Sequence, residues 1–129
     1  MFHETRGVVM VVDDDEDWRE LVVHFLEGVG FEVLEARDGH EALARLRSGA
    51  RTPDLVLTDL EMPVMTGWEL RRELLRDPVL ARVPVIVASS ADPGAIVADF
   101  FLPKPYCATD LLRTVSSALA LLPVESIAA

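Results

Sequence analysis

The chain has 129 residues, of which half are apolar and 26% are charged, and this composition predicts one globular domain with its own core rather than a disordered chain. With 22 acidic and 12 basic side chains, the formal net charge is −10, so nucleic acid and anionic lipid should repel the chain, and neither is expected as a partner. The single cysteine, Cys107, excludes an internal disulfide, and only three scattered histidines accompany it, which excludes a zinc cluster. No apolar stretch reaches the ~20 residues of a membrane span, and the first residues do not form a signal peptide, so a cytoplasmic location is expected.

Strand and helix patterns alternate along the whole chain. Five short segments predict strands, over Val8–Val12, Phe31–Ala36, Leu55–Leu57, Val85–Ala88 and Phe100–Leu102. The continuous apolar runs of the first and third segments predict buried strands. Apolar residues at helical spacing predict four helices, over Trp18–Val29, Asp38–Leu46, Gly67–Arg76 and Leu111–Leu122. This alternation predicts right-handed crossovers and a parallel sheet covered by helices on both faces.

The helix ends carry local signals. Asp38, followed three residues later by Glu41, predicts an N-cap with a capping box. Helices are expected to end at Gly28–Gly30, at Gly49 and at Pro123. The buried stripe of the first helix is expected to consist of Trp18, Leu21, Val22, Phe25, Leu26 and Val29.

Polar residues follow four of the predicted strands. Asp13 and Asp14 follow the first strand and Asp59 follows the third. Ser89 follows the fourth strand, and Lys104 comes shortly after the fifth. In a doubly wound parallel sheet, ligands bind beyond the carboxyl ends of the strands, so these residues are the candidate site.

The three carboxylates predict a metal site. Asp13, Asp14 and Asp59 would repel one another when gathered at one sheet edge, and protonation or a hard divalent cation relieves such repulsion. Mg²⁺ accepts one or two carboxylates together with water and phosphate oxygens. The alternative is a solvated acidic helix start over Asp13–Asp17, which the helix dipole favours. Asp59 favours the metal interpretation because it adds a carboxylate from a different strand.

The lysine and the hydroxyl complete a phosphoryl-transfer pattern. Lys104 lies between two prolines that restrict its backbone, so we interpret it as a charge partner rather than a mobile surface lysine. Ser89 offers a hydroxyl donor, although serine at a strand end is often only a turn residue. Asp59 would then be the nucleophile, Mg²⁺ on Asp14 and Asp59 would neutralise charge, and Lys104 and Ser89 would hold the remaining phosphoryl oxygens.

Taken in order, these fragments resemble the receiver domain of bacterial two-component response regulators. The resemblance covers roughly residues 7–122 and rests on Val11–Asp15, Asp59–Pro63 with Thr66–Gly67, Pro84–Ser89 and Lys104–Pro105. It implies a flavodoxin-like (CheY-like) doubly wound sheet of five parallel strands. It also implies one receiver domain over residues 1–129, apparently stand-alone, although a fragment of a longer regulator would have the same sequence.

The resemblance assigns roles to individual residues. It implies that Asp59 accepts phosphate from a sensor histidine kinase or a phosphotransfer protein. It implies a Mg²⁺ site in which Asp14, Asp59 and the backbone carbonyl of Glu61 are ligands and Asp13 assists through water. Ser89 stands at the family's switch hydroxyl and Phe101 at its switch aromatic. The chain is then a signalling switch that binds a downstream target protein, and not a metabolic enzyme.

One departure from the family concerns the fourth helix. Only 14 residues separate Ser89 from Lys104, and Pro93–Gly94 interrupts them, so that helix is expected to be short or missing. Ser90, where the family prefers alanine, is a milder departure. A short helix would leave the sheet poorly covered near Val85–Val87 and Phe100–Leu102. An exposed edge favours a contact with a second copy or a target, and the alternative is a monomer with an irregular lid.

Two other functions compete with the phosphorylated switch. A haloacid-dehalogenase type of phosphohydrolase needs a second aspartate two residues after the nucleophile, where this chain has Glu61, and we discount it. A receiver that binds its partner independently of phosphate stays open because of the shortened fourth-helix region. The sequence identifies neither the kinase nor the target.

Overall fold

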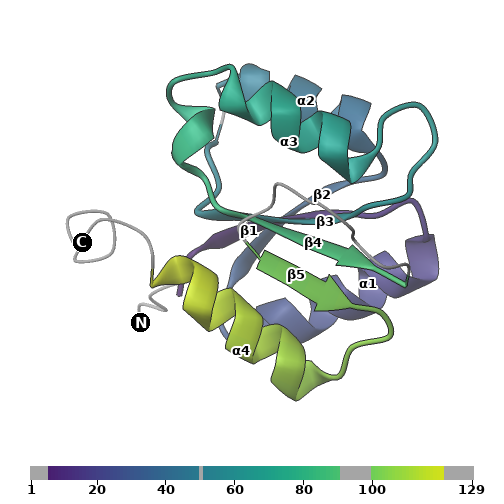
Figure 1. Cartoon of the computed structure of the whole chain (residues 1–129). Helices are drawn as coiled ribbons and strands as arrows, with labels where there is room; N and C mark the ends of the chain where they lie inside the picture. The colour runs from purple at the N-terminus through teal and green to yellow at the C-terminus, as the bar shows by residue number, and fades with distance from the viewer. Residues whose placement is uncertain (1–5, 50, 91–99, 121–129) are drawn as a thin grey trace.

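The computed structural model describes residues 6–49, 51–90 and 100–120, and it contains a five-stranded parallel sheet. The strands lie in the order β2-β1-β3-β4-β5, and adjacent strands pair in parallel (Figure 1). Their bounds are Val8–Val12 for β1, Glu32–Ala36 for β2, Leu55–Asp59 for β3, Val85–Ser89 for β4 and Phe100–Pro103 for β5. The predicted doubly wound α/β fold is confirmed.

Helices cover both faces of the sheet (Figure 1). On one face lie α1 (Glu16–Gly28) and α4 (Ala108–Leu119), and on the other lie α2 (Gly39–Arg47) and α3 (Gly67–Leu75). A short 3₁₀ turn over Leu80–Arg82 precedes β4. Each face has its own apolar cluster, because successive strand residues point to opposite sides. All five residues of β1 are buried, as a central parallel strand requires.

The start of α2 differs in part from the prediction. The Asp38 carboxylate accepts a hydrogen bond from the Glu41 backbone N–H at 2.8 Å, so the predicted N-cap is confirmed. The Glu41 carboxylate, however, accepts from the backbone N–H of Arg37, one residue before the cap, at 3.1 Å. A complete capping box is present instead at the start of α3, where Thr66 and Glu69 bond reciprocally.

The buried face of α1 also differs from the prediction. Leu21, expected to be buried, is 60% exposed, whereas Arg19 of the same helix is buried. The Arg19 guanidinium donates to the backbone carbonyl of Asp13 at 2.7 Å and to the Glu35 carboxylate at 3.2 Å. These two acceptors make it favourable to bury a cation next to the end of β1.

The last part of the chain is described only partly. Helix α4 begins three residues before the predicted start, with Cys107 as its N-cap residue, and it ends at Leu119. Leu122, Pro123 and the segment 91–99, on which the prediction of a short fourth helix rests, lie outside the described residues. Val85–Val87 are fully buried in the apolar clusters of the two faces, so the expectation of poor cover over these residues is wrong. In the edge strand β5, Leu102 is buried, whereas Phe100 and Phe101 are partly exposed. None of the helices within residues 6–49, 51–90 and 100–120 is both long and apolar enough to cross a membrane.

Candidate functional site

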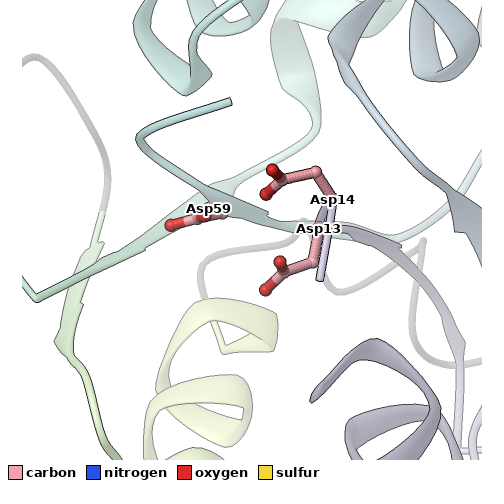
Figure 2. A group of neighbouring side chains, drawn as sticks. All are labelled: Asp13, Asp14 and Asp59. Atoms are coloured by element: carbon pink, nitrogen blue, oxygen red, sulfur yellow. The ribbon is translucent and has the colours of Figure 1, made fainter. Parts of the chain in front are cut away.

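Three carboxylates meet at the carboxyl edge of the sheet (Figure 2). Asp13 and Asp14 directly follow β1, and Asp59 is the last residue of β3. Strands β1 and β3 are neighbours, with Val12 opposite Thr58, so their ends reach the edge together. One carboxylate oxygen from each of the three aspartates lies within 4.8 Å of the other two.

The three aspartates have different environments. Asp13 is 4% exposed, and its Oδ1 accepts a hydrogen bond from the backbone N–H of Asp15 at 2.9 Å. Asp14 is exposed to solvent. Asp59 is partly buried, and its Oδ1 accepts from the backbone N–H of Leu60 at 2.9 Å. The site therefore has one buried, one half-buried and one solvent-facing carboxylate.

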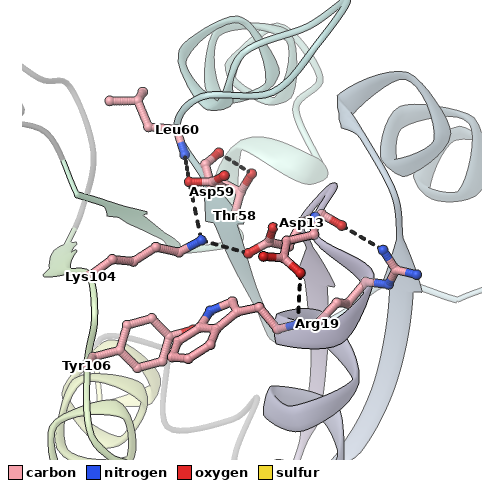
Figure 3. A network of polar contacts seen from close by, with 9 residues as sticks. Asp13, Arg19, Thr58, Asp59, Leu60, Lys104 and Tyr106 are labelled. Carbon is pink, nitrogen blue, oxygen red and sulfur yellow. Dashed lines mark hydrogen bonds and ion pairs between the residues drawn. The ribbon is translucent and has the colours of Figure 1, made fainter.

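Lys104 brings a positive charge into this acidic cluster (Figure 3). Its Nζ lies 2.9 Å from Asp13 Oδ2 and 3.6 Å from Asp59 Oδ1. Its backbone N–H donates to the Ser89 carbonyl at 2.9 Å, which fixes the chain just after β5 against the end of β4. The Lys104–Pro105 peptide bond is cis. Lys104 is thus held at the sheet edge by its backbone and its side chain together.

The electrostatics of Asp59 reflect this crowding. Burial, which disfavours the ionised carboxylate, raises the pKa of Asp59 to about 6, and the nearby charges of Asp13 and Asp14 act in the same direction. The Lys104 ammonium and the Leu60 N–H oppose the rise in pKa but do not cancel it. One ammonium does not balance three carboxylates, and their oxygens are hard donors that a divalent cation such as Mg²⁺ prefers. The donor set fits the predicted metal.

The structure also places the remaining predicted residues. Ser89, at the end of β4, is 2% exposed and lies one residue beyond Ala88, the register partner of Asp59. Phe101 is partly buried in β5 and packs against the apolar cluster of the α2–α3 face. Glu61 is exposed in the loop after β3, and the role of its carbonyl stays a prediction.

Sequence reasoning did not single out two features of the site. Arg19 holds the carbonyl of Asp13, and its acceptors become apparent only when α1, β1 and β2 are assembled. Gly67 begins α3 so close to the strand that an added Cβ would lie 2.5 Å from the Asp59 carbonyl oxygen. The signal for Gly67 was present, because Thr66–Gly67 belongs to the fragments that carry the family resemblance.

The chain is similar to known proteins in both sequence and fold. The sequence model of the response regulator receiver domain family matches residues 9–116 of this chain. The DNA-binding transcriptional regulator NtrC of Salmonella typhimurium is 35% identical over 123 residues, covering 89% of this chain and 25% of that protein. Protein PilH of Pseudomonas aeruginosa is 30% identical over 119 residues, covering 87% of this chain and 97% of PilH. The structure of chemotaxis protein CheY4 of Vibrio cholerae superposes with a TM-score of 0.81 at 31% identity, covering 88% and 99% of the two chains.

The extent of these matches defines what is shared. The chain spans only 10%, 25% and 51% of the lengths of the first three curated relatives that it matches. What is shared is therefore the receiver portion, with its CheY-like flavodoxin fold. The family match extends from the second residue of β1 into α4 and includes all three clustered aspartates and Lys104. The chain therefore belongs to the response regulator receiver domain family.

Proposed function

We propose that this chain is a phosphorylation-dependent switch in a two-component system, and that Asp59 accepts the phosphoryl group. Membership in the receiver family supports a role in two-component signalling. The observation that carries the assignment to Asp59 is its position between two other carboxylates and the Lys104 ammonium. The donor is a sensor histidine kinase or a phosphotransfer protein, and the phosphorylated domain binds a downstream target.

The proposed transfer is a substitution at phosphorus. An ionised Asp59 oxygen attacks the phosphorus atom, and the bond from phosphorus to the donor breaks with its electron pair on the leaving group. The product is an acyl phosphate. Because only the ionised carboxylate is a nucleophile, a pKa of about 6 leaves most Asp59 reactive at neutral pH.

The neighbouring side chains stabilise the charge of the incoming group. Asp13, Asp14, Asp59 and the backbone carbonyl of Glu61 would hold Mg²⁺, which when bound offsets the negative charge of the phosphoryl oxygens. Lys104 Nζ, at 3.6 Å from Asp59 Oδ1, is within reach of an oxygen on the attached phosphoryl group. These residues supply electrostatic stabilisation and positioning, which dominate phosphoryl transfer.

The proposed output couples this charge change to packing. The Ser89 hydroxyl moves toward the phosphoryl group, and the space that it leaves accepts the Phe101 ring. The partly buried position of Phe101 in β5, opposite Val87, is compatible with two ring arrangements. A structure with beryllofluoride on Asp59, as a substitute for the phosphoryl group, should show both side chains displaced, and an unchanged pair would refute the coupling.

The acceptor is tested by mass spectrometry of the intact protein after incubation with acetyl phosphate and Mg²⁺. Wild type should gain one phosphoryl group, and Asp59→Asn should gain none. Asp17→Asn, a change of an acidic residue in the first turn of α1, is the matched control and should be labelled like wild type. Rapid donor hydrolysis without a stable adduct would favour a phosphohydrolase. No reaction would favour an interaction module that does not depend on phosphate.

A further inference from the structure

The Lys104 ammonium has an aromatic neighbour besides its two carboxylates. Its Nζ lies 5.7 Å from the centre of the Trp18 ring, within the range of a cation–π interaction. Trp18 belongs to the first turns of α1, whereas Lys104 directly follows β5. The contact therefore joins two segments that are 86 positions apart in the sequence.

Trp18 is itself held in place by the residue two positions after Lys104. The Trp18 indole N–H donates a hydrogen bond to the Tyr106 hydroxyl at 3.3 Å. The two rings also pack edge to face, with centroids 5.1 Å apart and planes at 77°. Figure 3 shows Tyr106 below the Lys104 side chain in the view. One indole thus contacts both the lysine and the loop that carries it.

This arrangement restrains a side chain that otherwise rotates freely. Lysine has four rotatable side-chain bonds, and a single ion pair leaves its ammonium several positions. Asp13 at 2.9 Å, Asp59 at 3.6 Å and the ring face of Trp18 together limit these positions. The ring also excludes solvent from the part of the ammonium that it covers, which strengthens the ion pairs.

We propose that Trp18 is a positioning residue for Lys104: the ring holds the ammonium where the phosphoryl oxygens arrive during transfer to Asp59. The proposal rests on the proposed function, because it concerns the step in which Lys104 acts. Trp18 touches neither the donor nor the reacting atoms in this account. It acts through the lysine and through Tyr106.

A purely structural role for Trp18 is the competing explanation. Trp18 also lines an apolar hollow of about 350 Å³ between α1 and α4, together with Phe25 and Leu111. Replacing Trp18 could therefore act only by loosening this packing. Phe25→Leu is the matched control, because Phe25 lines the same hollow from the same helix. Within the part of the chain that the structure describes, the aromatic contact of Lys104 is with Trp18 and not with Phe25.

The kinetic test compares three variants in the acetyl phosphate reaction at saturating Mg²⁺. Trp18→Leu should lower the first-order labelling rate about three- to tenfold, which is the range of a partly desolvated cation–π contact. Trp18→Phe keeps a ring face and should recover to within about twofold of wild type. Phe25→Leu should react like wild type. Wild-type rates in Trp18→Leu, or equal losses in Trp18→Leu and Phe25→Leu, would overturn the proposal.

A spectroscopic test decides the contact independently of phosphorylation. In a Trp68→Phe background, Trp18 is the only tryptophan, and its emission reports charges near the indole ring. Lys104→Met should change this emission, whereas Arg72→Met, on the exposed side of α3, should not. Equal emission with and without Lys104 would refute the contact. If wild type takes no phosphoryl group, the proposed function fails, and this measurement still decides whether Lys104 contacts Trp18.

Discussion

At the scale of single residues, the site combines a nucleophile with an environment that resists its ionisation. Asp59 is partly buried beside two other carboxylates, and its pKa rises to about 6. Only Lys104 and one backbone N–H act against this rise. The charge that makes Asp59 reactive is therefore a destabilising charge in the metal-free protein, and this has measurable consequences.

The first consequence is a pH-dependent stability. Because folding raises the pKa of Asp59 from 3.8 to about 6, the folded state holds this proton more tightly than the unfolded state. The stabilisation is complete below the unfolded pKa and is lost as the pH rises through about 6. Urea unfolding in EDTA should show that the stability advantage of Asp59→Asn over wild type grows from about pH 4 to pH 7. A difference that is independent of pH would contradict the assignment.

The second consequence is stabilisation by the metal. At a concentration 100 times its Kd, Mg²⁺ should raise the free energy of unfolding of wild type by about 2.7 kcal/mol. Asp14→Ala should lose most of this response, and its metal-free form should be more stable than wild type because one repulsive charge is gone. Asp17→Ala, outside the cluster, should respond like wild type. Equal melting shifts with Mg²⁺ in wild type and Asp14→Ala would argue against the site.

Strain is also localised at one residue near the site. Val64, in the loop after β3, has a φ of +70° and is 79% exposed. A β-branched residue is unfavourable in this left-handed region, so Val64→Asn should stabilise the protein by about 1 kcal/mol. Val79→Asn is the matched control, since Val79 is 64% exposed but has a φ of −78°. Chemical denaturation should show little change in that control, and equal effects at both positions would exclude strain as the cause.

At the scale of elements, the strands were more predictable than the helix faces. All five predicted strands overlap the observed ones closely. The reason is clearest for β1 and β4, which are buried on both faces and are therefore continuous apolar runs, whereas the edge strand β2 contains Glu32 and Glu35 and is only partly buried. The buried side of α1 was less predictable. Arg19 is buried against the expected pattern because its acceptors are the carbonyl of Asp13, just after β1, and the carboxylate of Glu35 in β2. A tertiary contact of this kind leaves no periodic signal in the sequence.

At the junction of β3 and α3, the close approach of Gly67 to the strand predicts a cost for any larger residue. An added Cβ at Gly67 would lie 2.5 Å from the Asp59 carbonyl oxygen, and backbone cannot move aside as a flexible side chain can. Gly67→Ala should therefore destabilise the protein by about 2 kcal/mol or more and slow the labelling of Asp59. Gly28→Ala, at the end of α1, has nothing within 4 Å of the added Cβ and should be neutral or stabilising. Similar stability losses in both variants would refute the close approach.

At the scale of the whole molecule, the fold assembles the site from distant segments. The location of the site could be predicted from the sequence, because its polar residues follow the predicted strands. The pairing of Lys104 with the clustered carboxylates was predicted as well, and its ion pairs with Asp13 and Asp59 confirm it. The contact of Lys104 with Trp18 was not predicted, because it depends on how α1 packs beside the end of β5. The raised pKa of Asp59 is likewise a property of the assembled edge.

The central claim is that the assembled edge directs a phosphoryl group to one carboxylate. Borohydride reduces an acyl phosphate to an alcohol and so converts a phosphorylated aspartate into homoserine. After reaction with acetyl phosphate and Mg²⁺, borohydride treatment and peptide sequencing by mass spectrometry should therefore find homoserine at position 59. Positions 13 and 14, whose carboxylates lie in the same cluster, should remain aspartate. Homoserine at position 13 or 14, or an unmodified position 59 in protein that carries the label, would contradict the account.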